Sequence, residues 1–129
     1  MAKNGFRILL AAALLLAWAS SVSADAPPSA GVASWYGEEH RGRLMANGKR
    51  FNPDKLTAAS WFYPLGAKVR ITVHPPAKAP RSVLVKITDR GPAKELVEDG
   101  RVIDLALAAF KRLASPDLGL ITVTLDRLK

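Results

Sequence analysis

The sequence SVLVKITDRGP, residues 82–92, carries the clearest structural signal in this 129-residue chain. The apolar residues Val83, Val85 and Ile87 alternate with other residues, so their side chains lie on one face of an extended segment. Gly91 and Pro92 then interrupt the pattern. The stretch predicts a half-buried β-strand over residues 82–88 that ends at residue 89.

Other segments of the chain have the same extended character on both sides of this strand. They are Gly31–Gly37, Lys55–Ser60, Lys68–Val73 and Leu120–Leu125. Turn residues or proline-rich stretches separate them, and the connection after the first one is long and polar. With no internal repeat and no second domain in the pattern, we predict a single, mainly β domain over residues 31–129.

A helical stripe of apolar residues follows Asp104, at positions 105, 107, 108, 109 and 113. Asp104 is well placed to cap the beginning of a helix, and Pro116 lies just beyond its end. We therefore predict one short helix between strands. Ala93–Arg101, just before it, is expected to be a charged loop with room for a helical turn.

The N-terminal residues have the features of a secretory signal peptide. Lys3 and Arg7 precede an apolar stretch over residues 8–18, and Val22-Ser23-Ala24 supplies small residues for cleavage. The apolar stretch is too short to cross a bilayer, which takes roughly 20 residues. We predict a signal peptide over residues 1–24, a flexible leader over 25–30, and an exported protein, periplasmic or secreted, with no transmembrane anchor.

The absence of cysteine narrows the chemistry further. The domain therefore has to be stable without disulfides. It can neither use a catalytic thiol nor carry a lipid on a cysteine after the apolar stretch. A serine nucleophile elbow and a phosphate-binding glycine loop are also missing. His40 and His74 are far apart without a partner motif, so we expect no metal and no cofactor.

Basic residues outnumber acidic ones. The chain has 19 Lys and Arg against 11 Asp and Glu, and 17 basic residues remain without Lys3 and Arg7. In an exported protein this excess favours wall polymers or anionic membrane surfaces over nucleic acid. It can also serve solubility alone, and without a basic run it identifies no ligand.

Several segments, taken in order, resemble the rare lipoprotein A (RlpA-like) family of double-psi β-barrels. The matching segments are Ala33–Gly37, Gly42–Gly48, Leu56–Ala59, Leu65-Gly66, Val69–Thr72, Ile87–Pro92 and Arg101–Leu105. The resemblance implies a six-stranded double-psi β-barrel whose cleft binds peptidoglycan glycan strands. It also implies endolytic lytic transglycosylation, in which the MurNAc–GlcNAc bond is cut without water and a 1,6-anhydro product is left.

This chemistry requires at least one well-placed carboxyl group. The C6 hydroxyl of the sugar takes the place of water, so one carboxyl group can act first as acid and then as base. Asp89 and Asp104 both fall on motif positions. Arg90 beside Asp89 favours its ionised form, whereas apolar neighbours favour protonated Asp104. Physical reasoning favours Asp104 as the acid, and the resemblance points at least as strongly to Asp89.

Each aspartate also has a purely structural interpretation. Asp104 could simply cap the predicted helix, and Asp89 could pair with Arg90 or accept hydrogen bonds from turn amides. A structural and a catalytic role can coexist in one residue, so both aspartates are retained as catalytic candidates.

Candidate substrate-binding residues are Tyr36, Asn47, Lys49, Ser60 and Arg90. Two of them depart from the family pattern, because Lys49 stands where members usually have Glu and Ser60 where they usually have His. These departures remove a carboxylate and an imidazole from the expected cleft. The polar loop could compensate through Glu38, Glu39 or His40, which are otherwise solvated.

Two aromatic clusters lie at strand ends, Trp35-Tyr36 and Trp61-Phe62-Tyr63. An aromatic ring can pack against the apolar face of a sugar, and it can equally fill a protein core. Tyr36 is the best candidate for the cleft, because it leads directly into the polar loop.

Three function classes remain. The first is a monomeric lytic transglycosylase acting on wall glycan. The second is an expansin-like barrel that binds glycan without cutting it, which Lys49 and Ser60 favour. The third is a protein-binding or inhibitory barrel, which would bind a partner protein and not purified glycan.

Overall fold

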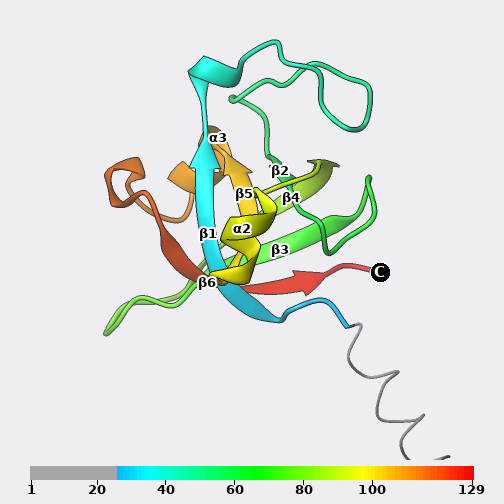
Figure 1. The fold of residues 1–129 in the computed structure, drawn as a ribbon. Coiled ribbons are helices and arrows are strands. Elements are labelled where there is room, and N and C mark those ends of the chain that lie inside the picture. The colour runs from blue at the N-terminus through cyan, green and yellow to red at the C-terminus, as the bar shows by residue number, and fades with distance from the viewer. Residues whose placement is uncertain (1–25) are drawn as a thin grey trace, which may run out of the picture.

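Six β-strands close into a barrel in the computed structural model, which describes residues 26–129 (Figure 1). The strands are β1 (Ala30–Tyr36), β2 (Thr57–Ala59), β3 (Lys68–Val73), β4 (Arg81–Asp89), β5 (Arg101–Ala106) and β6 (Ile121–Arg127). Their order around the barrel is β1-β5-β2-β4-β3-β6. The predicted six-stranded, mainly β fold is confirmed, and the predicted signal peptide lies outside the described residues.

Two pairs of neighbouring strands run parallel, β1 with β5 and β2 with β4. The other neighbours are antiparallel. The alternation read from the sequence of β4 is present, since Val83, Val85 and Ile87 are buried while Leu84 and Lys86 are exposed. The buried face of β4 meets apolar side chains of β3, β5 and β6 in one core.

The predicted beginning of the helix is wrong, because Asp104 and Leu105 belong to strand β5. Arg101–Ala106 pairs with β1 and β2, so Asp104 belongs to a strand and caps no helix. Both faces of this strand are covered, and its buried residues are Val102, Ile103, Leu105 and Ala106. A strand buried on both faces has a continuous apolar run, which sequence periodicity cannot distinguish from the start of a helix.

The described residues contain two short α-helices instead of the one predicted, α2 (Lys94–Glu98) and α3 (Leu107–Lys111). Ala106 is the N-cap of α3, which packs on the barrel through the buried side chains of Ala109 and Phe110. Two 3-10 turns complete the fold, η2 (Glu38–His40) and η3 (Pro116–Leu118). None of the helices between residues 26 and 129 is long and apolar enough to span a membrane.

A long connection between β1 and β2 extends over one end of the barrel (Figure 1). It folds back on itself through a β-bridge between Leu44 and Arg50. A small apolar cluster holds it in place, in which Met45 and Phe51 pack with Ala106 of β5. This connection, residues 37–56, is called the end loop below.

At the other end of β1, the backbone that precedes the barrel is hydrogen-bonded to it. The Ser29 carbonyl accepts a hydrogen bond from the Leu125 N–H at 2.9 Å. This contact lies within the stretch predicted to be a flexible leader, and β1 begins at the next residue.

Candidate functional site

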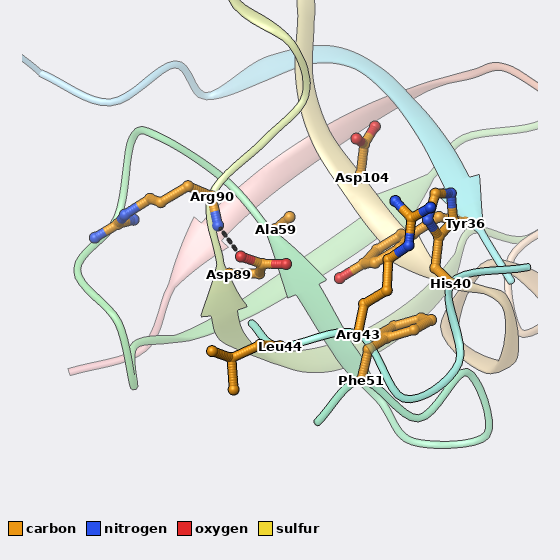
Figure 2. Close-up of a pocket in the computed structure, with 9 residues that line it drawn as sticks. All are labelled: Tyr36, His40, Arg43, Leu44, Phe51, Ala59, Asp89, Arg90 and Asp104. Carbon is orange, nitrogen blue, oxygen red and sulfur yellow. Dashed lines mark hydrogen bonds between the residues drawn. The ribbon is translucent and has the colours of Figure 1, made fainter. Parts of the chain in front are cut away.

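A cavity of about 300 Å³ opens between the end loop and the ends of four strands. Figure 2 shows the residues that line it, which are Tyr36, His40, Arg43, Leu44, Phe51, Ala59, Asp89, Arg90 and Asp104. Both aspartates singled out in the sequence therefore lie in one cavity, together with Tyr36.

Strand register brings the two aspartates to the same place. Ala59 of β2 pairs with Asp89 of β4 on one side and with Asp104 of β5 on the other. Because neighbouring strands lie about 4.8 Å apart, the two aspartate backbones are separated by roughly 10 Å. Alanine between them is small, and Gly91 nearby has no side chain, so the space between the carboxyl groups stays open.

Asp104 is a partly buried carboxyl group. The hydroxyl of Ser34, its register partner on β1, donates a hydrogen bond to Asp104 Oδ1. Burial raises the pKa of Asp104 above its usual range, and this rise is opposed by the Ser34 hydrogen bond and by electrostatic interaction with Arg101 and His40. The net effect favours the protonated carboxyl, which is the form that a general acid needs.

Asp89 is fixed by the backbone. Its Oδ1 accepts hydrogen bonds from the backbone N–H of Ala46, at 2.9 Å, and of Arg90, at 2.8 Å. The guanidinium of Arg90 instead donates to the carbonyls of Ser60, at 2.7 Å, and Tyr63, at 2.6 Å. In Figure 2 the Arg90 side chain accordingly extends away from Asp89. Arg90 thus holds the chain after β2, and its side chain forms no ion pair with Asp89.

Tyr36 forms an aromatic wall of the cavity. Its ring stacks on Phe51, with centroids 4.2 Å apart, and meets the edge of the His40 ring at 5.9 Å. The Tyr36 hydroxyl is buried and has no hydrogen-bond partner within residues 26–129. Burial, together with the charges of Asp89 and Asp104, raises the pKa of Tyr36, so the phenol stays neutral and can donate to a ligand.

The end loop supplies residues that sequence reasoning either left open or missed. His40 lines the cavity, whereas Glu38 and Glu39 are exposed and Glu38 pairs with Arg41. Arg43 and Phe51 were not predicted at all. Arg43 lies in the matched segment Gly42–Gly48 but was given no role there, and Phe51 lies in no motif or periodic segment. The return path of the loop brings both to the cavity.

The remaining predicted substrate-binding residues lie elsewhere. Asn47 and Lys49 line a second cavity, described below. Ser60 is completely buried, where its hydroxyl donates to the Val102 carbonyl at 3.1 Å and accepts from the Phe62 N–H at 3.2 Å. Only Tyr36 and Arg90 of the five therefore line the cavity that holds the two aspartates.

The other aromatic residues mostly serve packing. Trp35 packs against the core and donates from its indole N–H to the Pro116 carbonyl at 3.0 Å. Tyr63 is buried in the same core. Trp61 is the most exposed of them, and its ring lies beneath the ammonium group of Lys94.

The side chains of the site are suited to acid–base catalysis. A partly buried carboxyl group with a raised pKa faces the same cavity as a second carboxyl group, an arrangement suited to cleaving glycosidic bonds. Within the part of the chain that the structure describes, no three His, Cys, Asp or Glu side chains are grouped to hold a metal ion.

Comparison with known proteins identifies the family. A family model described as "Lytic transglycolase" matches residues 28–125. The chain is 43% identical over 96 residues to the "Probable endolytic peptidoglycan transglycosylase RlpA" of Synechocystis sp., covering 74% of this chain and 28% of that protein. It is 45% identical over 83 residues to the "Endolytic peptidoglycan transglycosylase RlpA" of Yersinia pestis, covering 64% and 21%.

The chain thus spans about a quarter of the length of these two relatives. A solved structure of the "Streptomyces papain inhibitor (SPI)" is similar in fold, with a TM-score of 0.54 at 22% identity, covering 77% of this chain and 92% of that one. The family match over most of the chain and the two relatives show that this protein belongs to the RlpA-like lytic transglycolase family of double-psi β-barrels.

Proposed function

We propose that the protein is an exported endolytic lytic transglycosylase that cuts the MurNAc–GlcNAc bond of peptidoglycan glycan strands. The observation that carries the proposal is the single cavity shared by Asp89, Asp104 and the unpaired hydroxyl of Tyr36. The names of the two relatives support the reaction class.

In the proposed mechanism Asp104 is the general acid. It donates its proton to the glycosidic oxygen as the bond between that oxygen and C1 of MurNAc breaks. The carboxylate of Asp89 lies across Ala59 and stabilises the positive charge that develops at C1.

The second half of the reaction closes the anhydro ring. The C6 hydroxyl of the same MurNAc attacks C1, and the Asp104 carboxylate takes up the hydroxyl proton. One C–O bond breaks and another forms, the acid is regenerated, and no water is consumed.

The other polar side chains of the cavity are proposed to position the sugar. The Tyr36 phenol can donate to a sugar oxygen, and its ring is held by stacking on Phe51. His40 lies beside Tyr36 and supplies an imidazole to the cavity. The resemblance implies an imidazole at the position of Ser60, so His40 is proposed to take its place from a different segment.

Product analysis tests the proposal. Peptide-free glycan and intact sacculi are incubated with the purified protein, and the soluble products are examined by mass spectrometry. We expect 1,6-anhydro-MurNAc ends. Products that have gained water would identify a hydrolase instead, and unchanged glycan with no binding to sacculi would overturn the assignment to wall glycan.

A glycan-binding barrel that does not cut is the second candidate. It is favoured by Lys49 and Ser60, which stand where the family resemblance implies a Glu and a His. Under this alternative the protein co-sediments with sacculi, yet no anhydro ends form. Product analysis and co-sedimentation together therefore separate the two candidates.

A further inference from the structure

A second cavity, of about 160 Å³, lies beside the first. Its lining residues come from the end loop, β2 and β4, and they are Met45, Asn47, Lys49, Arg50, Asn52, Lys55, Thr57, Lys86 and Thr88. Four of them are cationic, and none of the nine is acidic. We refer to it as the basic cavity.

Two threonine hydroxyls in the basic cavity have no protein partner. The Oγ1 atoms of Thr57 and Thr88 are buried and make no hydrogen bond within residues 26–129. Thr88 is only 5% exposed. An unpaired buried hydroxyl lowers stability, and one that lines a cavity can complete its hydrogen bonding with a ligand there.

Strand register places these hydroxyls next to a lysine. Thr57 of β2 pairs with Lys86 of β4, and Thr88 lies two residues further along β4 on the same face. The cavity therefore combines hydroxyl donors with lysine ammonium groups. Hydroxyl donors and cations with no carboxylate among the lining residues form a site for an oxyanion, because each group can donate to a negatively charged oxygen.

The basic cavity is also close to the proposed catalytic site. Thr88 and Asp89 are consecutive on β4, and each lines a different cavity. The end loop connects them further, because the Asn47 N–H donates to the Thr88 carbonyl and the Ala46 N–H donates to Asp89 Oδ1. A glycan strand in the first cavity would thus carry its neighbouring substituents toward the second.

We propose that the basic cavity binds a carboxylate carried by the glycan strand, and so selects carboxylate-bearing sugars next to the bond that is cut. This inference rests on the proposed action on peptidoglycan. Two sources share this chemistry: the lactyl carboxylate of a peptide-free MurNAc and a carboxylate of a stem peptide. Lys49 contributes to the positive charge at a position where the resemblance implies Glu, so the site is expected to be a property of this chain.

The test compares oligosaccharides with and without a carboxylate. Binding is measured by calorimetry to peptide-free GlcNAc–MurNAc oligosaccharides, to the same oligosaccharides with the lactyl carboxylate converted to an amide, and to oligosaccharides that carry stem peptides. The full chain is used with Asp104→Asn, so that no cleavage occurs. Charge-assisted hydrogen bonds predict about tenfold tighter binding of a carboxylate-bearing ligand than of the amide.

Variants assign the effect to the basic cavity. Lys86→Gln and Thr88→Val are each expected to remove most of the tenfold preference, whereas Lys111→Gln, an exposed lysine on α3, keeps it. Thr88→Val has nearly the same shape and removes an unpaired hydroxyl, so its melting temperature should not fall. If Thr88→Val binds the carboxylate-bearing ligand more weakly while its stability is unchanged, the lost affinity is due to the missing hydroxyl.

Each outcome is decisive. Tight binding of the peptide-free carboxylate assigns the lactyl group, and tight binding only of the peptide-bearing ligand assigns the stem peptide. Equal affinity for carboxylate and amide ligands overturns the inference, even if the unsubstituted protein releases anhydro ends. A preference that depends on Lys86 without any release of anhydro ends supports the site and overturns the proposed catalysis instead.

Discussion

Asp89 and Asp104 face one cavity from two strands that are separated only by β2. This arrangement depends on the closed barrel, because the two residues come from different segments that pair with opposite edges of a three-residue strand. Their surroundings differ. Asp104 is partly buried, hydrogen-bonded to Ser34, and has a raised pKa. Asp89 is held by backbone N–H groups, and this difference is the basis for assigning the two residues different roles.

Ser34→Ala should shift the pH dependence of cleavage. The Ser34 hydroxyl lowers the pKa of Asp104 against the larger effect of burial, so its removal raises that pKa further. Activity that needs protonated Asp104 falls as pH rises through this pKa, and the fall should move to higher pH in the variant. Rates of anhydro release across a pH series measure it. Ser82→Ala, an exposed serine on β4, is the control, and coincident profiles for all three proteins would contradict the assigned acid.

Asp104→Asn should stabilise the protein at neutral pH. The folded-state pKa of Asp104 is raised above the unfolded value of about 3.9, so its ionised form is disfavoured by folding. At pH values above the folded-state pKa, replacing Asp104 by the neutral Asn therefore raises the free energy of unfolding. The gain declines as pH falls through that pKa and disappears below the unfolded value.

Urea unfolding at several pH values measures this gain. The exposed Asp117→Asn should change stability by no more than about 0.5 kcal/mol at any pH. If Asp104→Asn is the less stable protein at pH 7, the burial of Asp104 does not disfavour its charge, and the assignment of a raised pKa is wrong.

Gly91→Ala should separate activity from stability. A Cβ atom at Gly91 would lie 3.4 Å from both Asp104 Oδ2 and Ala59 Cβ, which is ordinary van der Waals contact, so the fold should tolerate it. The change in unfolding free energy should stay within about 1 kcal/mol. The added methyl group lies against the acid, however, and we expect cleavage to fall by roughly ten- to a hundredfold. Full activity would place the reacting bond away from Asp104 Oδ2.

Ser60→Ala should act on stability and leave glycan binding unchanged. The variant leaves the Val102 carbonyl and the Phe62 N–H without the Ser60 hydroxyl. Buried polar groups without partners predict a loss of about 1–3 kcal/mol in the free energy of unfolding. Co-sedimentation with sacculi, measured well below the melting temperature, should match that of the parent protein. A stable variant that no longer binds would instead make Ser60 a ligand-binding residue.

The sequence predicts the barrel best where only one face of a strand is buried. Val83, Val85 and Ile87 identify β4 because exposed residues alternate with them. Strand β5 has no such alternation, since both its faces are covered, and the pattern from Asp104 onward predicts a helix where the strand still continues.

The candidate site was predictable where it is built from strand ends. Tyr36, Asp89 and Asp104 all lie in strands, so motif positions sufficed to propose them. The contributions of the end loop depend on how it folds back, which no local pattern encodes. For this reason Arg43 and Phe51 were missed, and Asn47 and Lys49 line the basic cavity instead of the first one.

Release of 1,6-anhydro-MurNAc ends by the parent protein, Asp104→Asn and Asp89→Asn tests the central claim most directly, with co-sedimentation measured in parallel. The parent should release anhydro ends. Asp104→Asn should bind sacculi equally well and release them roughly 10²- to 10⁴-fold more slowly, as expected on loss of a general acid. Asp89→Asn should also be slowed. Undiminished release by both variants would contradict the assignment of this cavity as the catalytic site.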